Sequence, residues 1–263
     1  VIRMQSCLQN QGYAVGYLAA LCAKEKKPIR KIDMKKVQRY LVEIGNLPSR
    51  VLKDTDFKGF RSKEMLQAAK SIPENYKGLE ILLTDKKRCL ELLNKQIVLT
   101  TSADERVMLA SVLCILGESK YASVLEEKIK EYTKWDEGWH YTGMGQFGMS
   151  ASRLDALLMA LGNAKQESSL PVIIEKTALL KPEDYFSHFR AVSMAFESIG
   201  SKDAVPTLTK MLTMPGVRNH SISSFHDARK SVVPDADDVS TRNKSLKELH
   251  IARALYLCGD KDS

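Results

Sequence analysis

Histidines and carboxylates gather in two segments whose side chains could do chemistry. His220 and His226 lie in a long polar stretch, residues 214–245. Aspartates follow in the same stretch, at Asp227, Asp235, Asp237 and Asp238. A metal site would need ligands at a compact spacing, and a calcium loop would need a glycine turn and a distal glutamate, which this stretch lacks. We therefore expect no metal there.

His140 stands among glycines and aromatic residues in a second segment, residues 135–150. A histidine in such a place could serve as a general base, but no neighbouring nucleophile or acid is identifiable in the sequence. The chain also has no Walker loop, no GxGxxG after a strand, no GxSxG and no HExxH. We expect no catalytic residue within residues 50–263.

The five cysteines are widely separated, and no pair has the CxxC spacing of zinc or redox sites. Most are set among leucine, isoleucine and alanine, so we expect buried thiols with neither metal nor disulfide. They are Cys7, Cys22, Cys89, Cys114 and Cys258.

The overall composition is that of an ordinary globular protein, with 263 residues, 44% of them hydrophobic and 27% charged. The net charge of +8 comes from lysines and arginines that are mixed with 32 acidic residues along the chain. This favours a dispersed charged surface over a nucleic-acid interface. The longest stretch of low charge, residues 4–23, is too short in apolar residues to cross a bilayer. We therefore expect no nucleic-acid partner and no membrane span, and the compartment stays open.

From about residue 100 a pattern repeats, in which an apolar helix ends in a glycine and a polar turn leads to a second apolar helix. The repeating glycines are Gly117, Gly162, Gly200 and Gly259. Each is predicted to take the left-handed conformation that ends a helix at low cost. The next helices should then begin with Ser168 and Asp203 as caps, and with Pro171 and Pro206 in the first turn.

The glycines are 45, 38 and 59 residues apart, and the first two intervals are close to those of the helix-pair repeats called HEAT or armadillo. The predicted fold is therefore all-α, a right-handed superhelix of HEAT-like helix pairs, with a generic helical bundle as the alternative. Residues 135–150 and 214–245 interrupt the repeats. The aromatic residues of the first interruption predict an ordered loop, and the length of the second is typical of functional or partly disordered loops.

The last repeat stops at "GDKDS", where its second helix should begin. The preceding apolar helix would then lack a partner, and its unburied area would be worth about 25 cal/mol per Å². We therefore expect the chain to be a piece of a longer one.

A helix near the start of the chain carries little bulk. Glycine and alanine recur on it at helical spacing, which permits the close approach of a neighbouring backbone or a flat ligand. These small residues are Gly12, Ala14, Gly16, Ala19, Ala20 and Ala23. We expect the helix to begin near Asn10, Gln11 and Gly12, where free amide donors and the positive end of the helix dipole could stabilise an electron-rich group. The residues alone favour the alternative, a tightly packed helix with no ligand.

Residues 3–45 resemble the closing segment of flavin-dependent oxidoreductases with a glutathione-reductase-like FAD domain. The small residues above, with Asn10, fall on a pattern like N-x-G-x-A-x-G-x-A-A-x-x-A, whereas Tyr13 and Tyr17 depart from it. The resemblance implies that Gln11, Gly12 and neighbouring amides face the flavin ring in a parent protein. The glycine-rich phosphate loop that would hold the rest of FAD is absent from this sequence.

The helical repeats also look like the C-terminal extension of a bacterial subgroup of these enzymes. We therefore expect residues 1–48 to be the remnant of an FAD domain and residues 49–263 to be a HEAT-like domain with a structural or docking role beside it. Asn10, Gln11 and Gly12 would contact FAD only in the parent, whose missing flavin domain would be the partner. The chain alone would neither hold FAD tightly nor turn over substrate. A free-standing repeat scaffold that binds another protein is the alternative.

Overall fold

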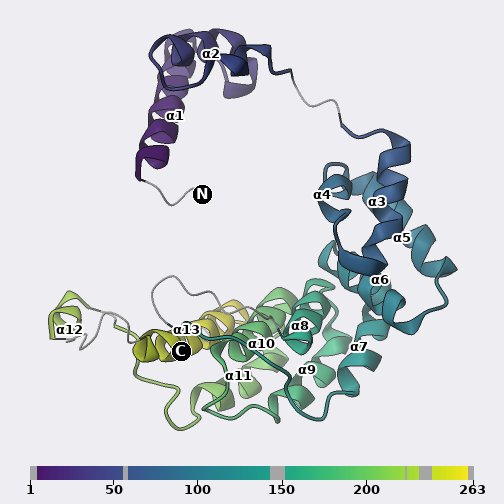
Figure 1. The fold of residues 1–263 in the computed structure, drawn as a ribbon. Helices are drawn as coiled ribbons and strands as arrows, with labels where there is room; N and C mark the ends of the chain where they lie inside the picture. The colour runs from purple at the N-terminus through teal and green to yellow at the C-terminus, as the bar shows by residue number, and fades with distance from the viewer. Residues whose placement is uncertain (1–4, 56–58, 143–151, 223, 231–238, 260–263) are drawn as a thin grey trace. The chain divides into compact units, whose positions relative to one another are not determined.

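The computed structural model describes residues 5–55, 59–142, 152–222, 224–230 and 239–259 (Figure 1). Within these ranges the chain forms thirteen α-helices joined by turns and short 3-10 helices, and it forms no strand. The prediction of an all-α fold is therefore confirmed. The chain divides into two compact units, residues 1–59 and 60–263, which are described separately below.

The first unit is built on two helices, α1 (Gln5–Glu25) and α2 (Met34–Glu43). The side chain of Asp33 caps α2 by accepting hydrogen bonds from the backbone N–H groups of Lys35 and Lys36. A small apolar core joins the two helices, consisting of Leu21, Ile32, Val37 and Leu41. The rings of Tyr17 and Tyr40 stack beside this core with their centroids 4.2 Å apart.

The helix α1 begins earlier than the sequence analysis expects. It is already helical at Gln5, so the expected start near residues 10–12 is wrong. The reason is local, because the glutamines and leucine before Gly12 are good helix formers and nothing there stops a helix. The backbone N–H groups of Asn10, Gln11 and Gly12 therefore lie inside the helical hydrogen-bond ladder.

The second unit contains eleven of the described helices, and eight of them lie as neighbours in two series. One series, in chain order, is α3 (Ser62–Asn75), α6 (Ala103–Ile115), α8 (Arg153–Asn163), α10 (Phe186–Ile199) and α13 (Ser240–Leu257), and each member contacts the next. The other series is α7 (Ala122–Lys130), α9 (Leu170–Thr177) and α11 (Val205–Leu212), again in contact in chain order. Figure 1 shows α8, α10 and α13 side by side.

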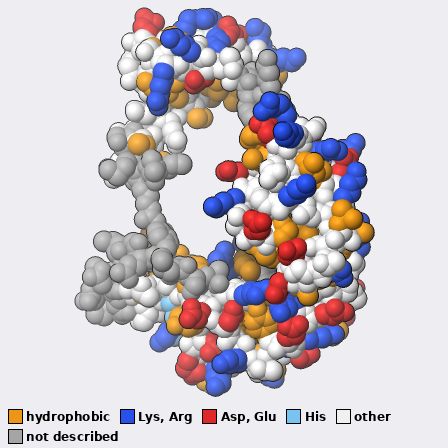
Figure 2. Space-filling view, turned by 45° about the vertical axis from the view of Figure 1, so that its right-hand side comes forward, with side chains coloured by type: hydrophobic (Ala, Val, Ile, Leu, Met, Phe, Trp, Pro, Cys, Tyr) orange, Lys and Arg blue, Asp and Glu red, His pale blue; other side chains and the backbone are white. Residues whose placement is uncertain are grey.

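The remaining helices of this unit are α4 (Leu79–Leu82), α5 (Lys86–Leu99) and α12 (Phe225–Lys230). α4 and α5 pack beside α3, and α5 also contacts α6. One continuous apolar core runs through the unit from Met65 in α3 to Cys258 after α13. Lysine, arginine and carboxylate side chains are interspersed on the face of this unit drawn in Figure 2.

The repeating glycines fulfil two different roles. Gly117, Gly200 and Gly259 have φ values of +98°, +72° and +103°, so they end their helices in the left-handed conformation that was predicted. Gly162 does not, because it lies inside α8 and the left-handed residue after that helix is Lys165, with φ of +54°. Gly162 is instead a point of close approach between α8 and α10, since a methyl group there would lie 2.8 Å from the carbonyl oxygen of Ala195.

The helices that follow Gly117, Gly162 and Gly200 each begin through a short 3-10 turn that the sequence analysis did not predict. These turns span Ser119–Tyr121, Glu167–Ser169 and Lys202–Ala204. Pro171 and Pro206 lie in the first turn of α9 and α11, as predicted. The predicted caps are wrong. Ser168 lies within a 3-10 turn. The cap of the next turn is Ser201, whose side-chain oxygen accepts a hydrogen bond from the backbone N–H of Asp203.

Three cysteines are buried in the second unit, and burial raises the pKa of the Cys114 thiol to about 12. All five cysteines are free. The expectation of burial is wrong for Cys7, which is exposed on α1. No helix in the described part of the chain combines the length and apolar character that crossing a bilayer requires.

Candidate functional site

The aromatic loop before α8 is held against the starts of α8 and α10 by a buried polar cluster. The indole N–H of Trp135 donates to Oδ1 of Asp155 over 2.8 Å, and Nδ1 of His188 lies 2.9 Å from the same oxygen. Asp155 and His188 are only 3% and 2% exposed. Gly138 passes so close that a methyl group on it would lie 2.8 Å from Nε2 of His188. The expectation of an ordered loop therefore holds for its described part, which ends at residue 142.

The next residues of this loop pack around Phe186, the first residue of α10. Trp139 meets the Phe186 ring edge-on at 4.8 Å, and Tyr141 stacks on it at 5.9 Å between centroids. The backbone N–H of Phe186 donates to Nδ1 of His140 over 2.9 Å. Because Nδ1 accepts this bond, the neutral imidazole carries its proton on Nε2. Burial, together with the positive charge of Lys247, lowers the pKa of His140 to about 4, so the ring is neutral near pH 7.

The start of α13 is tied to the same loop by a reciprocal pair of hydrogen bonds. Oδ1 of Asn243 accepts from the backbone N–H of Tyr141 over 2.9 Å, and Nδ2 of Asn243 donates to the Tyr141 carbonyl over 2.8 Å. The guanidinium of Arg242 lies 3.8 Å from the centre of the Tyr141 ring. Residues about a hundred positions apart are thereby joined at one place.

The second interruption, after α11, reaches this place through Glu248 of α13. The carboxylate of Glu248 accepts three backbone N–H groups, those of Asn219, His220 and Ser221, at 2.8–2.9 Å. Burial acts to raise the pKa of Glu248, but these hydrogen bonds outweigh it and leave the pKa lowered. Residues 219–221 of this loop are therefore fixed on α13.

A cavity of about 400 Å³ lies between the two loops and α13, and we call it the junction cavity. It is lined by His140, Pro182, Glu183, Pro215, Gly216, His220, Ser240, Asn243, Lys244 and Lys247. Lys247 is 5% exposed, and its ammonium group donates to the carbonyl of Pro182 over 2.6 Å and lies 4.9 Å from the centre of the Phe189 ring. Burial lowers the pKa of Lys247, although Asp184 and Glu183 partly oppose the shift.

The structure brings together only some of the residues considered in the sequence. His140 and His220 both line the junction cavity, whereas His226 is exposed on α12. Asp227 accepts a hydrogen bond from the Ser224 hydroxyl, and Asp235, Asp237 and Asp238 lie outside the described residues. Among the residues that are described, no three histidine, cysteine or carboxylate side chains cluster as metal ligands would.

Sequence reasoning missed Lys247, Asn243 and the Asp155–His188 contact. The sequence did carry a signal for Asn243 and Lys247. These two residues share a helical spacing with the buried Ile251, Leu255 and Cys258, so they lie on the buried side of α13 and its end. A lysine and an asparagine on the buried side of a helix require polar partners, which points to a built polar site. No comparable signal marked Asp155, whose partners are supplied by other segments of the chain.

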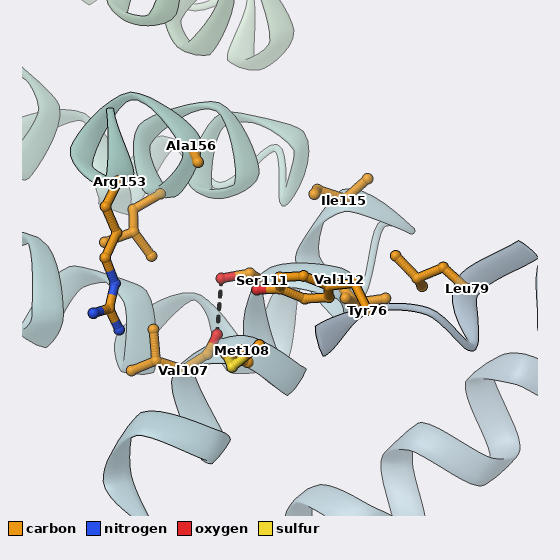
Figure 3. A pocket seen from close by; sticks show the side chains of 10 residues that line it. Tyr76, Leu79, Val107, Met108, Ser111, Val112, Ile115, Arg153 and Ala156 are labelled. Carbon is orange, nitrogen blue, oxygen red and sulfur yellow. Dashed lines mark hydrogen bonds between the residues drawn. The ribbon is translucent and has the colours of Figure 1, made fainter. Parts of the chain in front are cut away.

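A second cavity, of about 350 Å³, lies along α6 between the α3–α4 turn and α8 (Figure 3). The described residues that line it are almost entirely apolar, and Arg153, at one end, is the charged one among them. The guanidinium of Arg153 lies 3.4 Å from the carboxylate of Asp104. The hydroxyl of Ser111 donates to the carbonyl of Val107 in its own helix, so it presents little polarity to the cavity.

The residues predicted to contact FAD in a parent protein lie on α1 of the first unit. Asn10, Gln11 and Gly12 are all exposed, and the carbonyl of Asn10 accepts a hydrogen bond from the side-chain amide of Asn46 over 3.2 Å. Their backbone N–H groups donate hydrogen bonds within the helix, so these groups do not fit the predicted role as free donors.

Comparisons of the chain with protein-family models, with curated proteins and with solved structures found no match.

Proposed function

We propose that this chain is the C-terminal part of an FAD-dependent oxidoreductase, and that its helical repeat region has a structural or docking role beside the flavin domain. The observation that supports the proposal is an apolar face of α1 that is not packed within its own unit. The sequence resemblance over residues 3–45 identifies the kind of neighbour that such a face would pack against.

α1 has two apolar faces, and only one of them is packed within its own unit. Tyr17, Leu18 and Leu21 lie toward α2. The opposite face carries Leu8, Gly12, Val15, Gly16, Ala19 and Ala23. Leu8 is 50% and Val15 65% exposed, and a methyl group on Gly12 or Gly16 would meet nothing within 4 Å. A face that is apolar, flat and open in this way is suited to close packing against another backbone.

FAD would belong to the parent protein, with Asn10, Gln11 and Gly12 near its flavin ring. Because the N–H groups of these residues are used inside α1, we derive no step of flavin chemistry from them. Among the described residues, no strand leads into a glycine-rich loop of the kind on which a dinucleotide phosphate binds. The chain alone is therefore expected neither to hold FAD tightly nor to catalyse turnover.

The natural polypeptide provides the test. An antibody against residues 60–263 would be used to purify it under native conditions, followed by intact-mass measurement and a visible absorption spectrum. We expect a polypeptide of more than 263 residues with one flavin bound per chain, and no saturable uptake of FAD by the 263-residue chain alone. A colourless natural polypeptide that takes up no added FAD would refute the proposal.

A variant pair tests the role of the free face of α1 in the same purified protein. Gly16→Leu adds bulk to that face, and Arg39→Leu adds the same side chain at an exposed position of α2. We expect flavin retention to fall for Gly16→Leu and to be unchanged for Arg39→Leu. Equal retention in both variants would show that the face does not pack on the flavin domain.

A repeat scaffold that binds another protein is the second candidate, and a surface groove favours it. The groove lies between α3 and α5, has a volume of about 370 Å³, and includes Leu66 and Leu99, which are 46% and 80% exposed. Two exposed leucines beside a groove are typical of interaction surfaces. A colourless natural polypeptide that co-purifies with one protein in a fixed ratio, and loses it on Leu99→Asp, would favour this candidate.

A further inference from the structure

We propose that the junction cavity binds the oxyanion group, carboxylate or phosphate, of a small molecule, with Nζ of Lys247 and Nε2–H of His140 as donors. This inference concerns the second unit alone and does not depend on a flavin domain.

The first argument is the position of the buried ammonium group of Lys247. A buried cation is costly unless hydrogen bonds or a negative charge compensate it. Lys247 donates to one carbonyl, that of Pro182, whereas an ammonium group has three donors. Among the described residues no carboxylate lies within ion-pair distance of Lys247. The Phe189 ring and the charges of Asp184 and Glu183 compensate the ammonium group in part, and an anion in the cavity beside it would add a direct partner.

The second argument is the fixed tautomer of His140. The hydrogen bond from Phe186 N–H occupies Nδ1, so the other ring nitrogen, Nε2, is a donor. His140 packs against the rings of Tyr185 and Phe186, at 4.5 and 6.3 Å between centroids, which hold the imidazole in place. A rigid N–H group and an ammonium group on the wall of one cavity form a donor set suited to an acceptor-only ligand.

The third argument is the electrostatic field of α13. The first two turns of this 18-residue helix supply four of the lining residues, Ser240, Asn243, Lys244 and Lys247. The N-terminal end of the helix carries a partial positive charge, which adds to the two lysines. Among the described lining residues Glu183 is the one carboxylate, and it is exposed. The described part of the wall therefore carries an excess of positive charge.

The size of the cavity bounds the ligand. At about 30 Å³ per non-hydrogen atom, a volume of 400 Å³ accommodates on the order of a dozen such atoms. This suits a small organic acid or a phosphate ester of similar size, and it excludes a dinucleotide lying wholly within the cavity.

The test is a calorimetric titration of the full 263-residue chain with inorganic phosphate and, separately, with acetate, at constant ionic strength set with sodium chloride. Saturation by one anion alone identifies that chemistry, and saturation by both identifies a general oxyanion site. Saturation by neither anion overturns the proposal.

Three variants locate the binding. Lys247→Met keeps the length of the buried side chain and removes its charge, and we expect it to weaken binding tenfold or more, since it removes a hydrogen bond to a charged group. Lys244→Met changes an exposed position on the same wall, so the fold is retained, and we expect a loss of several-fold. Lys210→Met, on the exposed side of α11, is the matched control and should bind as the unaltered chain does.

The three variants also separate loss of the site from loss of the fold. Tryptophan emission is the folding control, because Trp135 and Trp139 both lie in the loop that borders the cavity. If Lys247→Met is unfolded, the comparison of Lys244→Met with Lys210→Met decides, and equal affinities in those two variants overturn the proposal. A folded Lys247→Met chain with unchanged affinity overturns it as well.

Discussion

Replacing Gly162 with alanine perturbs a close approach between α8 and α10 of the second unit. The added methyl group would lie 2.8 Å from the carbonyl oxygen and 2.9 Å from Cβ of Ala195, and closer still to its Cα. These are backbone atoms and a Cβ, so no side-chain rotation relieves the overlap. α10 must move away from α8, and the core residues packed between the two helices then lose contact.

Two opposing effects set the magnitude. Alanine is favoured over glycine inside a helix by about 1 kcal/mol. Overpacking in a filled core costs about 1–3 kcal/mol, and the upper end applies because the obstacle is main chain. We expect the free energy of unfolding of the second unit to fall by about 2 kcal/mol, which corresponds to a decrease of about 4–8 °C in the melting temperature of a unit this size.

Urea unfolding monitored by tryptophan fluorescence measures this change, because both tryptophans lie in the second unit. Gly16→Ala is the matched control, since it makes the same change in the open face of α1 and should leave the tryptophan transition where it is. A Gly162→Ala chain with a midpoint equal to or above that of the unaltered chain, at unchanged slope, would refute the close approach of α8 and α10.

Three further predictions concern the loops around the junction cavity. Asp155→Asn alters the buried carboxylate that accepts the hydrogen bond from the Trp135 indole N–H. We expect the free energy of unfolding to fall by about 1–3 kcal/mol. Fluorescence should show tryptophan emission shifted to longer wavelength. Because the pKa of His140 falls from 6.5 to about 4 on folding, the unfolded chain binds more protons between these values, so stability decreases as the pH is lowered through this window. Melting temperatures at pH 7 and pH 5 should therefore differ by less in His140→Gln. Glu248→Gln weakens the acceptor of three backbone N–H groups, and hydrogen exchange at those three amides should become faster while amides in α8 keep their rates.

Local signals in the sequence predicted the helices and several of their ends. Gly117 and Gly200 end their helices with positive φ because glycine adopts that conformation without a steric penalty, and this preference does not depend on what surrounds the helix. Pro171 and Pro206 lie in first turns for a similar reason, since a missing N–H donor costs little there. Such features follow from a few neighbouring residues.

Gly162 shows where local reasoning failed. It follows an apolar helical stripe just as Gly117 and Gly200 do, yet its function is to admit the backbone of α10. A glycine that ends a helix and a glycine that permits close packing look alike in one sequence. Only the position of a partner 33 residues away distinguishes them, since Gly162 meets Ala195.

The candidate site depended still more on contacts distant in sequence. The sequence by itself determined that the fold is helical and that an aromatic segment and a polar segment interrupt the apolar helices, because these are properties of composition and spacing. It did not predict that α12 and the first residues of α13 lie within the polar segment, residues 214–245. Only the tertiary structure decided that Tyr141 meets Asn243, that Lys247 is buried beside His140, and that Asp155 contacts His188. The physical reason is that burial and hydrogen-bond partners are set by the packing of α8, α10 and α13, whereas helix periodicity and turn preference are set within a few residues of each position.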